Sequence, residues 1–173
     1  MDNNVYNNMK KPNDECFTRK IDADKLVEYI LKNNLVALDA KIWLPFKDEN
    51  SNITLAFREN GFTNLITTDY DFFENSPDDF DVIISNPPFS GRTKLLGRLM
   101  LFDKPFILLQ QTQAFNNQNF VNTLCLNKDI SFICPSRRFG FIRDKIETTS
   151  AVFWSFWFCY KINNKQIWNY LFC

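Results

Sequence analysis

Residues 81–90 read DVIISNPPFS and join a run of apolar residues to an asparagine, two prolines and a phenylalanine. The β-branched run in this stretch is typical of a buried strand. Proline has a fixed φ and no N–H group, so Pro87 and Pro88 end the strand and restrict the loop that follows. The stretch therefore predicts a central strand with a rigid polar loop at its carboxyl end.

The flanking segments alternate between strand-like and helix-like patterns. Apolar runs typical of strands occupy residues 41–46, 63–69, 80–85, 104–110, 130–135 and 150–162. Apolar residues at helical spacing occupy 21–34, 48–62, 92–102 and 119–127. This alternation predicts an α/β fold, a three-layer sandwich with a mostly parallel central sheet. The stretch between the strands at 41–46 and 80–85 is short by one strand and one helix, which predicts an abbreviated sheet.

Three helix boundaries carry residues typical of caps. Asp22 or Asp24 is the expected N-cap of the first helix, and Ser51 or a neighbour that of the second. Gly61 follows the second helix, where a glycine often ends the helical conformation.

Size and charge limit the function classes. The 173 residues, 45% of them hydrophobic and 23% charged, predict a single domain over 15–173 after a flexible, Asn-rich segment at 1–14. Lysine and arginine together number 20, as do aspartate and glutamate, so there is no net positive field to attract nucleic acid. Any nucleic-acid site must therefore be a local patch.

The chain has five scattered cysteines without a CxxC pair and contains no histidine. These features favour a reducing cytoplasm and disfavour a zinc site or a histidine base. The polar start and the lack of a long apolar run predict a soluble protein that binds neither metal nor membrane.

The loop at 86–89 has groups suited to hold a planar amine. Ligands of such sheets bind beyond the carboxyl ends of the strands. The Asn86 side-chain oxygen and the Pro87 carbonyl can accept the two hydrogens of an exocyclic amine, and Phe89 can stack on its ring. This arrangement exposes the nitrogen lone pair for attack on a methyl group. A proline turn that merely ends the strand is the structural alternative.

Three segments in this order resemble the amino-methyltransferases, S-adenosylmethionine-dependent enzymes that methylate the N6 of adenine in DNA. FDVIISNPPF at 80–89 is similar to the family's strand and catalytic tetrapeptide, and the acidic segment at 67–81 to its cofactor-adenine segment. ECFTRKIDADKLVEYIL at 15–31 resembles the segment that opens the gamma-ordered members, with Arg19 where proline is usual. Small phage-encoded relatives have a first strand that ends in WxPF, as at 43–46.

The resemblance implies a Rossmann-like class I methyltransferase fold and a set of site residues. The catalytic residues it implies are Asn86, Pro87, Pro88 and Phe89. The cofactor, S-adenosylmethionine, would be contacted by Phe17, Thr18, Trp43, Pro45, Phe46, Asp69, Asp71, Phe72 and Asn86. Asp69 is also open to a purely structural reading as a cap of the segment that follows.

One departure from the family concerns glycine. The family has a glycine-rich loop after its first strand, where backbone amides approach the cofactor closely. None of the four glycines, Gly61, Gly91, Gly97 and Gly140, lies in this loop. Either the Pro-Phe loop makes a different contact, or the cofactor site has decayed.

Two basic clusters are candidate contacts for nucleic acid. The first, Arg137, Arg138 and Phe139, combines cations for phosphates with a ring for bases, although a solvated loop is the alternative. The second follows the NPPF loop at helical spacing and comprises Arg92, Lys94 and Arg98. The aromatic run at 153–160 is expected to be a core strand.

The sequence therefore predicts a minimal S-adenosylmethionine-dependent methyltransferase that flips adenine out of DNA and methylates its N6. Two alternatives remain. The acceptor is RNA or a protein glutamine amide, or the chain is a non-catalytic binding module, for example a phage-type anti-defence protein. Little of the chain is left for target recognition, so base preference would come from short loops or a protein partner.

Overall fold

The computed structural model describes residues 16–46, 49–67, 71–88, 91–143, 146–162 and 168–170. The expected flexible segment at 1–14 lies outside these residues, as do the predicted site residues Asp69 and Phe89. No helix among the described residues has the length and apolar character needed to cross a membrane.

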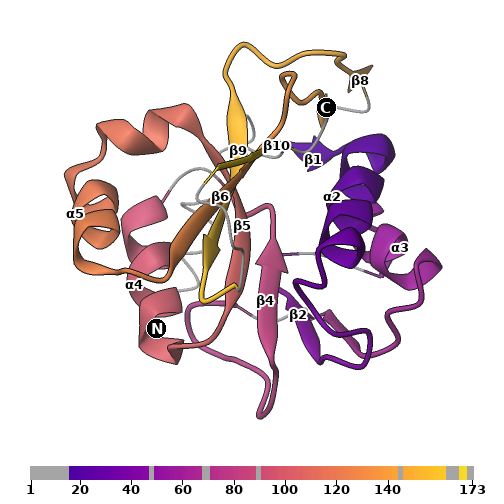
Figure 1. The fold of residues 1–173 in the computed structure, drawn as a ribbon, viewed down its shortest axis with the longest axis horizontal. Coiled ribbons are helices and arrows are strands. Elements are labelled where there is room, and N and C mark those ends of the chain that lie inside the picture. Colours follow the sequence, from indigo (N-terminus) through magenta and orange to yellow (C-terminus); the bar gives the residue numbers. More distant parts are fainter. Residues whose placement is uncertain are drawn as a thin grey trace.

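A seven-stranded sheet forms the centre of the fold, in the order β10-β6-β9-β5-β4-β2-β3 (Figure 1). Its strands are β2 (Ile42–Leu44), β3 (Leu65–Thr67), β4 (Val82–Ser85), β5 (Phe106–Gln111), β6 (Ile130–Cys134), β9 (Ser155–Tyr160) and β10 (Trp168–Tyr170). β9 runs antiparallel to both β5 and β6, and the other neighbours are parallel. The sheet is therefore mixed, which corrects the expectation of a mostly parallel one.

Helices cover both faces of this sheet, as the sequence predicts for a three-layer α/β sandwich. α2 (Lys20–Lys32) and α3 (Asn52–Glu59) pack on one face, and α4 (Arg92–Phe102) and α5 (Gln118–Leu126) on the other (Figure 1). A short 3-10 helix, η1 (Thr112–Asn116), follows β5. The described residues between β3 and β4, 71–81, form turns rather than a helix.

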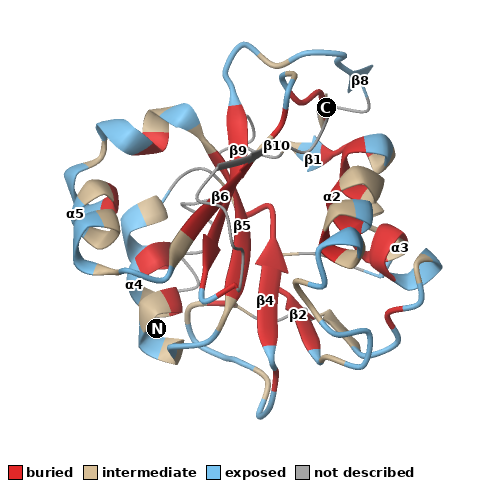
Figure 2. Ribbon diagram, viewed as in Figure 1, coloured by how far each residue is buried: buried red, intermediate tan, exposed pale blue. Residues whose placement is uncertain are grey.

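Two apolar clusters form the core, one on each side of the sheet (Figure 2). Alternate residues of β4 enter different clusters, because Val82 and Ile84 face α2 and α3 while Ile83 faces α4. The second cluster is mostly aromatic. The core therefore holds β4 on both faces and fixes the place from which the NPPF loop leaves the sheet.

The helix caps agree with the sequence at α3 and differ at α2. Ser51 accepts a hydrogen bond from the Thr54 N–H at 3.2 Å, and Gly61 lies beyond the helix at φ 90°. At α2 the N-cap is Arg19, without a side-chain cap. Asp22 lies inside the first turn and is fully buried. It is engaged in ion pairs rather than in capping.

A second, three-stranded sheet was not predicted from the sequence. It contains β1 (Phe17–Thr18), β7 (Phe141–Arg143) and β8 (Ile146–Glu147), with β1 antiparallel to β7 and β7 antiparallel to β8. The β4 arrowhead in Figure 1 points to the edge of the molecule where β1 and β8 lie. This small sheet therefore sits at the carboxyl edge of the main sheet.

Candidate active site

The order of the strands creates a switch point at β2. The chain runs from β2 to its neighbour β3 and then crosses to β4 on the other side of β2. In open α/β sheets, ligands bind beyond the carboxyl ends of strands at such a point. Here the loops that leave β2 and β4 meet, because the Ser85 hydroxyl donates to the Pro45 carbonyl at 2.6 Å.

Asn86, the first residue after β4, is almost fully buried and its amide is held from one side. Its Nδ2 donates to the Cys16 carbonyl at 2.8 Å and to the Thr18 Oγ1 at 3.1 Å. A carbonyl can only accept, so the nitrogen must face Cys16 and the orientation of the amide is fixed. The Asn86 Oδ1 is buried and has no hydrogen-bond partner among the described residues. An acceptor left in this state costs about 1–3 kcal/mol, which an incoming N–H donor would recover.

Strand β1 is the platform for this amide. The Asn52 Nδ2 donates to the Thr18 carbonyl at 2.9 Å, so α3 holds the same residue whose hydroxyl faces Asn86. Thr18 also pairs with Phe141 across the small sheet. The position of Thr18 is thus set from three directions.

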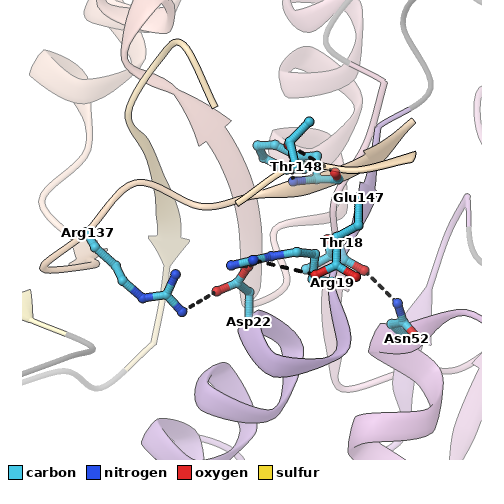
Figure 3. A network of polar contacts seen from close by, with 8 residues as sticks. Thr18, Arg19, Asp22, Asn52, Arg137, Glu147 and Thr148 are labelled. Carbon is cyan, nitrogen blue, oxygen red and sulfur yellow. Dashed lines mark hydrogen bonds and ion pairs between the residues drawn. The ribbon is translucent and has the colours of Figure 1, made fainter. Parts of the chain in front are cut away.

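A buried ion network continues from β1 into α2 (Figure 3). The Arg19 Nε donates to the Asp22 Oδ2 at 2.8 Å, and the Arg137 Nη2 donates to the Asp22 Oδ1 at 3.2 Å. Glu147 on β8 lies 3.6 Å from the Arg19 guanidinium. Asp22 is fully buried, so its charge must be paired; Arg19 balances it and Arg137 occupies its second oxygen.

Gly140 allows the backbone before β7 to lie against Arg19 and the Thr148 carbonyl. A Cβ atom at this position would lie 1.9 Å from the Thr148 carbonyl oxygen and 2.7 Å from the Arg19 guanidinium. Only glycine permits the backbone to approach the arginine so closely. The network therefore fixes β7 against Arg19, and through Arg19 it fixes β1.

The three residues of the first predicted nucleic-acid cluster have different environments in the fold. Arg137 is engaged by Asp22, and Phe139 is 1% exposed, so its ring is not accessible to a base. Arg138 is exposed and donates to the Val152 carbonyl at 3.4 Å. Of the three predicted residues, only Arg138 presents a side chain that a phosphate can reach without disturbing a buried contact.

The loop after β2 reaches the acidic segment through aromatic rings. The Phe46 and Phe72 ring centroids lie 5.0 Å apart, and the Asp71 Oδ1 accepts from the Phe73 N–H at 2.8 Å. Phe46 has φ 66°, a left-handed conformation that is uncommon for residues other than glycine. Phe46 thus adopts, in a loop without glycine, the backbone conformation that glycine favours.

Trp43 does not line this site. Its side chain is fully buried, with ring centroids 5.2 Å from Phe72 and 5.1 Å from Phe80. Phe72 is itself 2% exposed. Both rings belong to the aromatic core beneath the site, and their expected contacts with a cofactor stay predictions.

The cations of α4 lie against this aromatic core. Lys94 sits 4.4 Å from the centre of the Phe73 ring, and Arg98 lies over Phe72 and Phe102 at 5.6 and 5.0 Å. Arg92 donates to the Gln111 Oε1 at 3.2 Å. Arg92 therefore lies next to the end of β5. Lys94 and Arg98 lie next to Phe73 and Phe72 of the acidic segment.

The structure joins some of the predicted residues to one another. Asn86 donates to Thr18, the Pro45 carbonyl accepts from Ser85, and the Phe46 ring packs on the Phe72 ring. The sequence reading missed the parts played by Asn52, Asp22 and the Cys16 carbonyl. Asn52 and the Cys16 carbonyl have partners far away in the chain, and Asp22 pairs both with its neighbour Arg19 and with the distant Arg137.

A separate pocket of about 310 Å³ lies at the opposite edge of the sheet, where Asp81, Pro105 and Lys161 stand at strand ends. Two of its polar side chains are already engaged: Asp81 accepts from the Lys41 N–H at 2.8 Å, and Lys161 pairs with Asp103 at 2.7 Å. Among the described residues, no group of three or more cysteine, aspartate or glutamate side chains is placed to hold a metal ion.

Comparisons with known proteins bear on the fold. No protein-family model matches the chain, and no curated protein matches its sequence. A solved chain described as a modification subunit of a type I restriction enzyme from Vibrio vulnificus matches with a TM-score of 0.52 and 9% identity, over 85% of this chain and 44% of that one. A Haemonchus contortus phosphoethanolamine N-methyltransferase, solved with S-adenosylhomocysteine, matches with a TM-score of 0.42 and 9% identity, over 86% and 39%.

The first likeness shows that this chain shares the α/β fold of the modification subunit. The chain spans less than half the length of either solved chain.

Proposed function

We propose that this protein is an S-adenosylmethionine-dependent methyltransferase that acts on the N6 amine of adenine in DNA. The observation that carries the proposal is the Asn86 Oδ1, a buried acceptor without a partner among the described residues, at the switch point of the sheet. An exocyclic amine supplies the donor that this oxygen lacks. The description of the Vibrio vulnificus chain as a modification subunit of a restriction enzyme supports DNA as the substrate.

The chain's own residues bind and orient the amine. Asn86 accepts one N–H of the amine through Oδ1 and Pro87 accepts the other through its carbonyl, while the prolines limit the freedom of both acceptors. The adenine must leave the duplex to reach them. S-adenosylmethionine supplies the electrophilic methyl group. Much of the rate then comes from holding the amine in a productive orientation.

Three accessible side chains fit the cofactor. Phe17 is 47% exposed beside Thr18, and Phe46 and Asp71 are half-buried at the loops after β2 and β3. The Asp71 carboxylate uses one oxygen for the Phe73 N–H, which leaves the other for a donor such as the cofactor's adenine amine. Thr18 supports this site through Asn86 rather than through its own contact.

A second candidate function has one observation in its favour. Pro45 is buried and its carbonyl accepts from Ser85, so this part of the loop is closed onto β4. A loop of this kind suits a non-catalytic binding module with a methyltransferase-like fold.

Calorimetry with S-adenosylmethionine, followed by transfer of a labelled methyl group to DNA, RNA and protein, separates the two. Cofactor binding with labelled N6-methyladenine in DNA is the expected result. A protein that binds neither the cofactor nor its demethylated product at millimolar concentration would be a binding module.

A further inference from the structure

Charge is unevenly divided along the chain, although its net value is zero. Residues 91–173 contain 11 lysines and arginines and four aspartates and glutamates, whereas residues 1–90 contain nine and 16. The second half is therefore strongly basic. Such asymmetry is typical of a chain whose basic part meets a polyanion.

The acids of the second half that the structure describes lie away from the candidate active site or are paired. Asp103 ends α4 and pairs with Lys161 at 2.7 Å, and the Asp129 carbonyl accepts from the Lys161 N–H at 2.8 Å. Lys161 follows β9 at the amino edge of the parallel strands, so both acids lie there. Glu147 lies at the carboxyl edge but faces Arg19. This leaves the edge where β5 ends and β9 begins with more basic than acidic side chains from the second half.

Exposed aromatic rings occupy the same edge. Phe153 is 47% exposed, Trp154 45% and Phe115 39%, whereas all six residues of β9 that follow are buried (Figure 2). The Trp154 carbonyl accepts from the Thr112 N–H at 3.0 Å, which places it next to the start of η1. Phe115, within η1, packs on Phe156 at 5.3 Å. The exposed rings therefore lie on two segments, η1 and the β8–β9 connection, that the Thr112–Trp154 hydrogen bond holds together.

This surface borders the candidate active site. Gln111, which pairs with Ser155 on β9, accepts from Arg92, four residues beyond Pro88. On the other side, Arg138 reaches the Val152 carbonyl. Two guanidinium groups thus flank the exposed rings.

We propose that this aromatic face, defined by Phe115, Phe153 and Trp154 with Arg92 and Arg138, binds an unpaired stretch of the DNA strand next to the target adenine. The rings stack on bases and the guanidinium groups contact phosphates. The inference rests on the proposed function and gives the site its means of holding the substrate. In this proposal the exposed rings take the role that the sequence analysis predicts for Phe139 and Arg137, because Phe139 is buried and Arg137 pairs with Asp22.

Charge decides between this occupant and a second copy of the chain. A symmetric dimer through this face would place the same basic groups opposite one another, which is unfavourable. A DNA strand brings the opposite charge.

The test is the affinity for a fluorescent single-stranded DNA of about 15 nucleotides, measured by anisotropy at several salt concentrations without cofactor. Trp154→Ala should weaken binding by about five- to 150-fold through lost stacking, and Trp154→Phe should retain most of it. Arg138→Ala should weaken binding and lower the salt slope by roughly one. Leu101→Ala, at an 86% exposed residue of α4, and Lys32→Ala on α2 are the matched controls and should bind normally.

Wild-type affinity in both Trp154→Ala and Arg138→Ala would overturn the inference. So would an altered sedimentation mass of Trp154→Ala with unchanged DNA binding, because the face would then join copies of the chain. An RNA strand that displaces the DNA at lower concentration than DNA itself would overturn the assignment to DNA. If the variants lose binding while the wild-type protein transfers no methyl group, the DNA-binding face stands and the proposed function falls, together with the placement of that DNA next to a target adenine.

Discussion

The Asn86 Nδ2 lies 3.1 Å from the Thr18 Oγ1, so two residues 68 positions apart join the loop after β4 to strand β1. This contact, with the Cys16 carbonyl, points the amide oxygen of Asn86 away from β1. Thr18 is therefore a positioning residue for the proposed catalytic amide. The cofactor contact that the sequence resemblance implies for Thr18 stays a prediction.

Thr18→Val keeps the shape of the side chain and removes one of the two acceptors of the Asn86 amide. We expect kcat for methyl transfer to fall by roughly fivefold, because a net hydrogen bond of about 1 kcal/mol is lost where orientation matters. KM for the cofactor should change little. Thr18→Ser restores the hydroxyl and should recover most of the rate. Wild-type turnover in Thr18→Val would show that the hydroxyl does not position the Asn86 amide.

Two glycines offer a matched pair for the network around Arg19. Gly140→Ala places a Cβ 1.9 Å from the Thr148 carbonyl oxygen and should lower the free energy of unfolding by about 1–3 kcal/mol or more. Gly97 lies within α4 with nothing within 4 Å of its added Cβ. Gly97→Ala should raise the free energy of unfolding by up to about 1 kcal/mol. Urea denaturation measures both, and equal effects would argue against close packing at Gly140.

The sequence predicted what local patterns encode. β4 and its proline loop were located because β-branched residues stop at Pro87, and Ser51 was recognised because an N-cap needs only its own helix. Strand direction has no such signal, because an apolar run has the same pattern in a parallel strand and in an antiparallel one. The antiparallel β9 that makes the sheet mixed was therefore not foreseen.

Ion pairs between residues far apart in the chain could not be predicted from the sequence either. Asp22 fits the pattern of a cap, yet one of its two arginine partners, Arg137, lies 115 residues away. A charge cluster in the sequence does not reveal which members are neutralised in the fold. The exposure of Phe153 and Trp154 was also missed, because they continue the apolar run of β9 and differ from it only in lying beyond the sheet edge.

Cysteine reactivity should follow burial. Burial raises the pKa of the Cys159 thiol strongly and that of the Cys134 thiol to a lesser degree, whereas Cys125 is exposed. Thiolate is the reactive form, so Cys125 should be alkylated in the folded protein and Cys159 only after unfolding. Mass spectrometry after iodoacetamide treatment with and without denaturant measures this. Early modification of Cys159 would mean that β9 opens readily.

Substitutions at Phe46 can distinguish the contribution of its ring from that of its backbone conformation. Phe46→Gly and Phe46→Ala both lose the contact with Phe72, but only glycine adopts φ 66° without strain. We expect Phe46→Gly to be more stable than Phe46→Ala by up to about 1 kcal/mol. If the ring contacts the cofactor, S-adenosylmethionine should raise the melting temperature of both variants less than that of the wild type. Equal shifts in all three proteins would remove Phe46 from the cofactor site.

Asn86→Ala tests the proposed chemistry directly. The change removes the unpartnered Oδ1 and leaves the Cys16 carbonyl without its donor, so stability should change by only about 1 kcal/mol. Methyl transfer should fall about a hundredfold, because a hydrogen bond to a group that gains charge in the transition state is lost at a cost of roughly 3 kcal/mol. Asn60→Ala, which removes a comparable side-chain bond to the Ala56 carbonyl at 2.9 Å, is the control and should leave turnover unchanged. The measurement is labelled-methyl transfer to adenine-containing DNA, with folding checked by circular dichroism. If Asn86→Ala turns over like Asn60→Ala, the loop after β4 is a structural turn and the catalytic assignment is wrong.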